Sequence, residues 1–347
     1  MRIRVFKYAS PLLLYAGALL SFFSTGVIVW FPLLYAWVLI PLLELLLKPN
    51  EYNMTAAEEE LAKNDRLYDW MLYSIVPMQY LSLCCFLYYV SYTSHSIDII
   101  GKVMTMGLLC GTFGINVGHE LGHRANKMEQ LQSKALLLTS LYMHFFIEHN
   151  KGHHKRVATP DDPSSARLGE PVYFFYLRSI LMGYLSAWAI AARDVKKKGK
   201  PAFSLHNEML QYQLIQLLFI AILYMAFGGW TTFLFVVAAI QGILLLETVN
   251  YIEHYGLQRK EIAAGKYERA MPVHSWNSNH VIGRVTLFEL SRHSDHHYLA
   301  SRKYQILRHH DNSPQMPTGY PGMMILSLIP PAWFYVMNKR VKRLGAS

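Results

Sequence analysis

Six long apolar segments limit the folds that this chain of 347 residues can adopt. Most of them approach the ~20 residues that an α-helix needs to cross the ~30 Å hydrocarbon core of a bilayer. Charged residues make up only 16% of the chain, whereas soluble domains average about 25%. A backbone in lipid must satisfy its own hydrogen bonds, so the segments predict an all-α, integral-membrane bundle of about six transmembrane helices. The expected spans are residues 9–23, 26–47, 70–92, 101–118, 208–227 and 230–250.

Two further apolar stretches, residues 134–147 and 171–192, are ambiguous. The first is short, and Arg178 interrupts the second, so either could be re-entrant, interfacial or buried by other helices. No A-x-A-like cleavage site follows the first apolar run, which is therefore expected to be a membrane anchor. We expect one membrane-embedded domain over residues 1–347, with histidine-rich parts at 119–170 and 251–310.

Lysine and arginine residues predict the orientation of this bundle. They gather before the first span, between the second and third, before the fifth and after the last. The segments on the other side, residues 24–25, 93–100 and 228–229, are short and poor in both residue types. The positive-inside rule then places both termini, and every histidine cluster, on the cytoplasmic side of an inner membrane.

Nine of the 16 histidines fall in four short clusters at or beyond the ends of apolar stretches. Histidine is the commonest side-chain metal ligand, and two imidazoles spaced i, i+3 or i, i+4 on a helix share one face. Nine ligands are too many for one ion, so the count predicts two metals. The clusters are His119-Glu-Leu-Gly-His123, Glu148-His149-Asn-Lys-Gly-His153-His154, Glu253-His254 and His293-Ser-Asp-His296-His297.

The first cluster also matches H-E-x-x-H, the pattern of zinc metalloproteases, in which the glutamate is the general base. Such a protease needs only one more ligand, whereas this chain offers seven more in ligand-like spacing. Within the second cluster, His154 points about 100° away from His153 and could serve a second ion.

Four carboxylates adjoin the clusters and are candidates to accept the distal N–H of a ligating imidazole. They are Glu120, Glu148, Glu253 and Asp295. Some of them could be direct ligands instead, which the spacing does not decide. Among the other histidines, His144 is expected in the core, His95 at the surface, and His309 with His310 in a solvated loop.

These motifs resemble those of the integral-membrane alkane 1-monooxygenases, or alkane omega-hydroxylases, within the fatty acid desaturase and hydroxylase superfamily. The superfamily signature is H-x(3-4)-H, H-x(2-3)-H-H and a second H-x-x-H-H, and all three occur here. Residues 250–257 are similar to the narrower motif N-Y-x-E-H-Y-G-L, and residues 148–154 to E-H-x-x-G-H-H. Residues 292–297 are similar to R-H-S-D-H-H, although Ser291 stands where glutamine is common. The resemblance runs from about residue 116 to residue 331.

The resemblance implies an enzyme that inserts one oxygen atom of dioxygen into a terminal C–H bond of an alkane taken from the membrane lipid. It implies two iron ions and an electron-donating rubredoxin that is reduced by a flavoprotein reductase. The chain has no C-x-x-C pair, so the rubredoxin is expected in trans. The implied iron ligands are His119, His123, His149, His153, His154, His254, His293, His296 and His297.

Basic residues on the expected cytoplasmic segments could attract a rubredoxin, because rubredoxins are typically acidic. The candidates are Arg156, Arg167, Arg302, Lys303 and Arg308. A bulky residue should close the alkane channel, and Trp30, Trp37 and Phe113 are the candidates. No segment resembles a nucleic-acid-binding module.

Three other functions compete with this interpretation. The main alternative is a related membrane hydroxylase or desaturase that acts on an alkyl arene or an acyl chain. The second is a zinc-dependent intramembrane hydrolase, and the third is a transporter that uses histidines as a proton or metal path. A transporter should have histidines at successive depths along a path across the membrane, whereas these histidines gather on one side.

Overall fold

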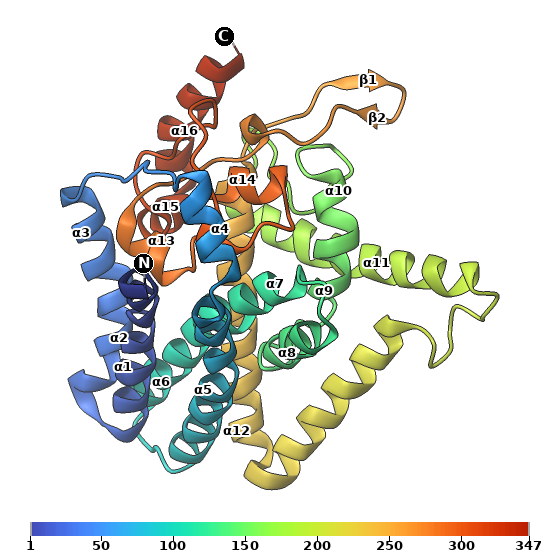
Figure 1. Cartoon of the computed structure of the whole chain (residues 1–347). Helices are drawn as coiled ribbons and strands as arrows, with labels where there is room; N and C mark the ends of the chain where they lie inside the picture. The colour runs from blue at the N-terminus through green and yellow to red at the C-terminus, as the bar shows by residue number, and fades with distance from the viewer. Residues whose placement is uncertain (1, 346–347) are drawn as a thin grey trace.

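The chain folds into a bundle of helices with one small hairpin of strands (Figure 1). The computed structural model describes residues 2–345. Within them the only strands are β1 (Glu261–Ala263) and β2 (Lys266–Tyr267), which pair antiparallel. The all-α prediction is therefore confirmed.

Six segments of the described chain are helical, long and apolar enough to cross a membrane. This confirms the predicted number, and the protein is a multi-pass membrane protein. The segments are Arg4–Phe23, Gly26–Leu46, Arg66–Ser91, Ser96–Gly122, Val172–Lys197 and Glu208–His254. A seventh apolar pair, α15 (Tyr320–Ser327) and α16 (Pro330–Gly345), is bent by 120°.

Three of the first four segments are assembled from several elements, whereas the third is a single helix. Their α-helices are α1 (Leu12–Phe23), α2 (Phe31–Leu34), α3 (Ile40–Leu46), α5 (Arg66–Ser91), α6 (Ser96–Leu109) and α7 (Asn116–Gly122). Two 3-10 helices lie at Arg2–Ala9 and Gly26–Trp30. Two π-helical turns, Tyr35–Leu39 and Cys110–Ile115, join α2 to α3 and α6 to α7. Such π-turns are rare and are frequent near functional sites.

The last two segments differ from the predicted spans. Residues 208–227 and 230–250 are the two arms of α12 (Glu208–His254), which bends sharply at Gly228 (Figure 1). Gly228 has φ 77° and ψ 172°, a conformation that favours glycine because it has no Cβ. The ambiguous stretch 171–192 forms α11 (Val172–Lys197), which runs across the direction of α1 and α5.

The remaining helices are short and lie outside these segments. They are α4 (Ala56–Asn64), α8 (Lys127–Leu138), α9 (Phe145–Ile147), α10 (His154–Arg156), α13 (Val281–Thr286) and α14 (His293–Tyr298). A π-turn at Glu148–His153 joins α9 to α10, and 3-10 turns lie at Pro272–His274 and Tyr304–Ile306. The other ambiguous stretch, 134–147, begins within α8, whose Leu136 and Leu137 are fully buried by neighbouring helices.

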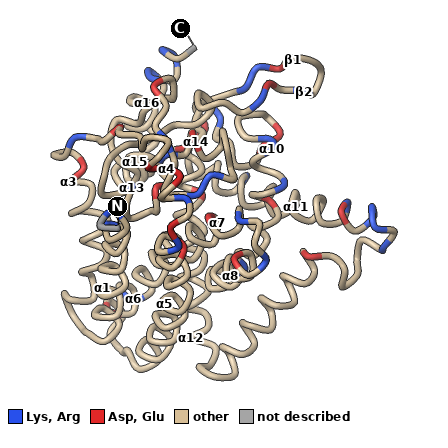
Figure 2. The backbone as a smooth tube through the Cα atoms, viewed as in Figure 1, with Lys and Arg blue, Asp and Glu red and all other residues tan. Residues whose placement is uncertain are grey.

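Charged residues gather at one end of the molecule (Figure 2). The opposite end carries the loop between α1 and α2, the loop between α5 and α6, and the bend of α12 (Figure 1). The charged end carries α10, α14 and the β1–β2 hairpin, and the chain enters α1 from this end. The end with the histidines is thus the basic end, in agreement with the distribution of loop charges in the sequence. Ser347, at the C-terminus, lies outside the described residues.

Glycines let α6 and its π-turn approach the second arm of α12 closely. A Cβ on Gly242 would lie 2.6 Å from the Cβ of Cys110, and a Cβ on Gly111 would lie 2.9 Å from the Cβ of Leu245. Small residues at helix contacts allow such backbone approach in membranes. The contact fixes two helices that each carry a clustered histidine at the charged end, His119 on α7 and His254 on α12.

Candidate metal centre

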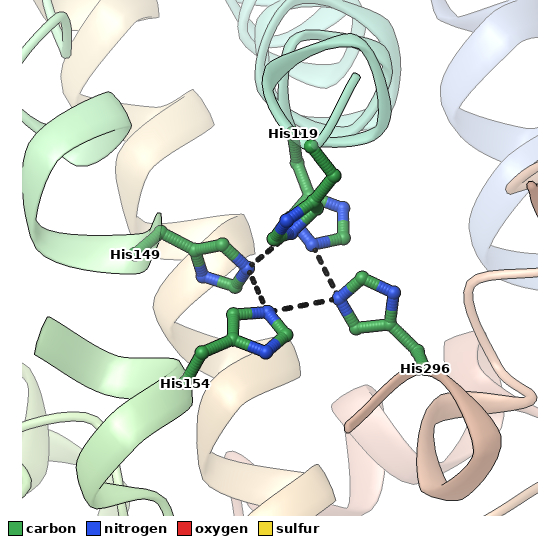
Figure 3. Close-up of side chains that lie close together, drawn as sticks. His119, His149, His154 and His296 are labelled. Carbon is green, nitrogen blue, oxygen red and sulfur yellow. Dashed lines mark hydrogen bonds between the residues drawn. The ribbon is translucent and has the colours of Figure 1, made fainter. Parts of the chain in front are cut away.

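All nine predicted histidines come together, and they form two groups. Within each group, one ring nitrogen per residue lies within 4.8 Å of every other. The first group contains His119, His123, His149, His154 and His296, and the second contains His153, His254, His293 and His297. Figure 3 labels four members of the first group, His119, His149, His154 and His296, with their ring nitrogens turned toward a common centre. The two groups touch, because the rings of His154 and His297 lie 4.5 Å apart between centroids.

Local helix geometry explains how neighbouring histidines reach different groups. His119 and its partner at i+4, His123, share one face at the end of α7. The π-turn at Glu148–His153, with its wider i→i+5 spacing, brings His149 and His154 into the same group. His153 therefore joins the second group, although it adjoins His154 in the sequence.

The α14 helix also directs neighbouring histidines into different groups. His293 and His297, spaced i, i+4, enter the second group, whereas His296 enters the first. The second group is completed by His254, the last residue of α12. Four separate parts of the chain therefore build the site.

The spacing of the ring nitrogens fits bound metal ions. In the first group, the Nε2 atoms of His119 and His296 lie 3.0 Å apart, and those of His154 and His149 lie 2.9 Å apart. In the second group, Nε2 of His297 lies 2.9 Å from that of His293 and 3.2 Å from that of His153. An ion bound at about 2.1 Å places neighbouring imidazole nitrogens roughly 3 Å apart. The residues present therefore fit two metal ions.

Three of these imidazoles are in the form that binds metal. Burial, followed by the neighbouring imidazoles, holds the pKa of His149, His293 and His296 well below the usual value. These rings are therefore neutral at neutral pH, and a neutral ring nitrogen carries the lone pair that a metal needs.

A carboxylate that the sequence did not single out holds one of the rings. Asp162 is 1% exposed, and its Oδ2 accepts a hydrogen bond from Nδ1 of His153 at 2.9 Å. The same Oδ2 also accepts a hydrogen bond from Ser165 Oγ. This contact fixes the tautomer that presents Nε2 of His153 to the second group. Asp162 belongs to the segment Asp161-Asp-Pro, but nothing in its spacing indicated which histidine it would meet.

The four predicted carboxylates have different partners. Glu120 accepts a hydrogen bond from Arg124 at 2.7 Å, and Asp295 from Arg302 at 2.7 Å. Glu148 pairs with Arg156. In the described chain no hydrogen bond joins these three carboxylates to a ring of the two groups. Glu253 differs, because its Oε2 lies 3.1 Å from Nε2 of His293.

Most of the proposed rubredoxin-docking side chains are held by carboxylates of the same chain. Besides Arg156 and Arg302, Lys303 pairs with Asp69 at 2.8 Å and Arg308 pairs with Glu59. Arg167 is exposed. Four of the five predicted docking residues therefore have their charges offset within the protein.

The remaining histidines lie apart from the two groups. His144 is buried, as expected, and His95 is exposed. The expectation of a solvated loop for His309 and His310 is wrong. His309 is 8% exposed and meets Asn279, while Nε2 of His310 lies 2.7 Å from Oδ1 of Asp295. Tertiary contacts, which the polar local sequence did not reveal, bury this loop.

An apolar cavity lies among the elements that carry the histidines. Its walls come from α1, the second and fourth segments, the second arm of α12, α13 with the turn that follows it, and α15. Asn116, three residues before His119, and Leu290, three residues before His293, are among its lining residues. Trp37 also lines it, whereas Trp30 and Phe113 are not among the lining residues. Phe113 instead stacks on Tyr15, with ring centroids 4.5 Å apart.

The fold and the site together define a multi-pass membrane protein with a histidine-rich site that could hold metal ions beside an apolar cavity.

Comparison with known proteins agrees with this class. Residues 99–327 match the fatty acid desaturase family. The chain is 40% identical to an alkane 1-monooxygenase of Acinetobacter baylyi over 305 residues, which are 88% of this chain and 74% of the relative. It is 45% identical to alkane 1-monooxygenase 1 of Pseudomonas aeruginosa over 243 residues, covering 70% of this chain and 64% of the relative. A more distant relative, the hydroxylase component of a xylene/toluene monooxygenase of Pseudomonas putida, is 28% identical over 71% of this chain and 65% of its own length. The chain belongs to the fatty acid desaturase family, in the group that includes the alkane 1-monooxygenases.

Proposed function

We propose that this protein is a diiron monooxygenase that hydroxylates the terminal carbon of alkanes to 1-alkanols. The observation that carries the proposal is the position of two groups of histidine nitrogens beside an apolar cavity among membrane-spanning helices. Its relatives named alkane 1-monooxygenase support the same reaction.

Iron is the metal that suits this site and reaction. Imidazole ligands suit iron, and zinc has no redox chemistry with which to activate dioxygen. Two iron ions bound here would supply the one-electron and dioxygen chemistry that amino-acid side chains do not provide. The role of the nine imidazoles is to hold the ions in a buried place that the end of the cavity approaches.

The cavity binds a substrate that has no polar handle. Burial of an alkane yields about 0.8 kcal/mol for each CH₂ group, so affinity grows with the length of chain that the cavity encloses. Leu108, Leu245 and Val249 are among its aliphatic walls. The amide of Asn116 donates to the backbone oxygen of Leu287 at 3.0 Å, so this polar side chain is occupied within the protein.

A groove on the outside of the bundle offers a route from the bilayer. It is lined by apolar residues of α1, α2 and the start of the following π-turn, including Leu20, Phe31 and Tyr35. Leu14 lines both this groove and the inner cavity. An alkane dissolved in lipid would therefore pass Leu14 to reach the cavity without entering water.

We further propose that rubredoxin docks in trans at a basic cleft beside the second histidine cluster. Lysines and arginines of α10, the end of α11 and the β1–β2 hairpin line this cleft, as the blue segments of Figure 2 indicate. Lys155, Lys197 and Lys266 form no ion pair with any described residue, unlike most of the side chains selected from the sequence. Their positive field would speed the encounter with an acidic donor. The loop charges support a cytoplasmic face of an inner membrane for this end.

The proposal is tested by metal analysis and product analysis of the same purified protein. We expect about two irons per chain and, with a rubredoxin and its reductase, 1-alkanols from a series of alkanes. Incubation with p-xylene and with a fatty acid tests the related hydroxylase and desaturase reactions. One zinc per chain, or oxidation of p-xylene without oxidation of any alkane, would refute the assignment.

A further inference from the structure

Glu253 is a buried carboxylate with few partners among protein side chains. It is 1% exposed and precedes His254 at the end of α12. Its Oε1 accepts a hydrogen bond from the hydroxyl of Tyr320 at 2.7 Å. Among the described residues no lysine or arginine forms an ion pair with it, and its other oxygen faces His293.

The other carboxylates near the histidines are compensated in ways that Glu253 is not. Glu120, Glu148 and Asp295 each pair with an arginine. Glu247, on the same arm of α12, has no cation either, but it accepts hydrogen bonds from a tyrosine, a serine and an asparagine. Burying a carboxylate is costly unless it is paired, hydrogen-bonded or bound to a metal. Glu253 therefore has no lysine or arginine among the described side chains to balance its charge, and another positive partner is needed.

The position of Oε2 indicates what that partner is. Oε2 lies 3.1 Å from Nε2 of His293, which itself lies 3.2 Å from Nε2 of His254 and 2.9 Å from Nε2 of His297. These separations are those of neighbouring ligand atoms around one ion, although Oε2 does not lie within 4.8 Å of all four ring nitrogens of the second group. Nδ1 of His293 is buried without a hydrogen-bond partner. The carboxylate thus lies on the side of His293 that faces the metal, whereas Asp162 holds the outer nitrogen of His153.

We propose that Oε2 of Glu253 is a direct ligand of the metal in the second histidine group. This inference rests on the proposed metal centre and goes beyond the nine histidines. It gives the second group five ligands, the same number as the five-histidine group. Tyr320, at the start of α15 next to the cavity-lining Pro321, is the positioning residue that holds the carboxylate through Oε1.

An anionic ligand on one ion makes the two ions different. A carboxylate favours the more highly charged, oxidised state of the ion that it binds, because it neutralises part of the charge. The first group offers only neutral imidazoles, so its ion is expected to be the easier one to reduce.

The test is the purified, iron-loaded full-length protein carrying Glu253→Gln, which removes the charge but keeps the shape. Mössbauer spectra of ⁵⁷Fe-loaded protein should change in the half of the signal that comes from the second site. A chelator should remove about one iron per chain at least about 10-fold faster than it does from the wild type. Glu247→Gln is the matched control, since it makes the same change on the same helix without contact to a histidine ring, and it should alter neither result.

A second variant keeps the inference testable if Glu253→Gln fails to fold. Tyr320→Phe leaves the carboxylate in place but frees Oε1, so both irons should stay bound while the same half of the spectrum shifts. The inference is overturned if wild type binds two irons and Glu253→Gln keeps both with an unchanged spectrum and unchanged extraction. It is also overturned if Tyr320→Phe leaves the spectrum unchanged. Absence of iron from the wild type would instead refute the proposed function.

Discussion

Replacing Trp37 by alanine should shift the enzyme toward longer alkanes. Trp37 lies on the π-turn between α2 and α3 and lines the apolar cavity. Its indole occupies space that an alkane could fill once the side chain is reduced to a methyl group. We therefore expect the cavity of the Trp37→Ala variant to enclose a longer part of the alkane chain.

The size of the shift follows from hydrophobic burial. Each additional CH₂ that the enlarged cavity encloses contributes about 0.8 kcal/mol, which is about fourfold in relative kcat/KM. An alkane longer by three methylene groups, all newly buried, would gain about 2.4 kcal/mol, or about 60-fold over the shorter one. The gain will be smaller if neighbouring side chains collapse into the space.

A competition assay measures this ratio directly. Equimolar alkanes of increasing length are incubated together, and the ratio of the 1-alkanols formed gives their relative kcat/KM. Trp30→Ala is the matched control, because Trp30 belongs to the same segment but packs beside Gly101 rather than lining the cavity. An unchanged product distribution in Trp37→Ala, or an equal shift in both variants, would show that Trp37 does not limit the substrate.

Three further predictions concern the metal, the topology and the electron donor. His153→Ala should lose iron and hydroxylation at matched expression, whereas His206→Ala, at an exposed position, should keep both; full activity in the first variant would contradict the metal assignment. Reporter fusions at Gly229 should report the outside and fusions after Lys200 the inside, and the reverse result would place the histidines on the wrong face. Lys266→Glu should raise the KM for rubredoxin most strongly at low ionic strength while leaving iron content intact, because screening shortens to ~8 Å at physiological salt. A KM that does not respond to the charge or to salt would place the docking surface elsewhere.

Three-dimensional contacts changed the interpretation of the basic residues more than that of the histidines. Arg308 pairs with Glu59 and Lys303 with Asp69, and both partners are more than 200 residues away in the chain. Sequence shows that a residue carries charge but not whether a distant carboxylate will neutralise it. The prediction that these side chains form a docking surface stays untested, and the unpaired lysines of the basic cleft offer a stronger alternative.

The sequence alone predicted the membrane bundle and the family, and it singled out the nine histidines that the structure brings together. The reason is that these properties are local or repetitive: helix length follows from runs of apolar residues, and a ligand pair such as His119 and His123 follows from the i, i+4 spacing of one helix. The motif of residues 250–257 likewise added His254, which its spacing alone did not decide.

Only the tertiary structure decided which histidines form each group, which carboxylates hold them and which tryptophan lines the cavity. Adjacent residues such as His153 and His154 separate into different groups because a π-turn and three distant elements meet there. Glu253 has the same sequence relation to His254 as Glu148 has to His149, yet only Glu148 meets an arginine. The difference is set by how the helices pack, because the surroundings of a side chain depend on segments that the local sequence does not contain.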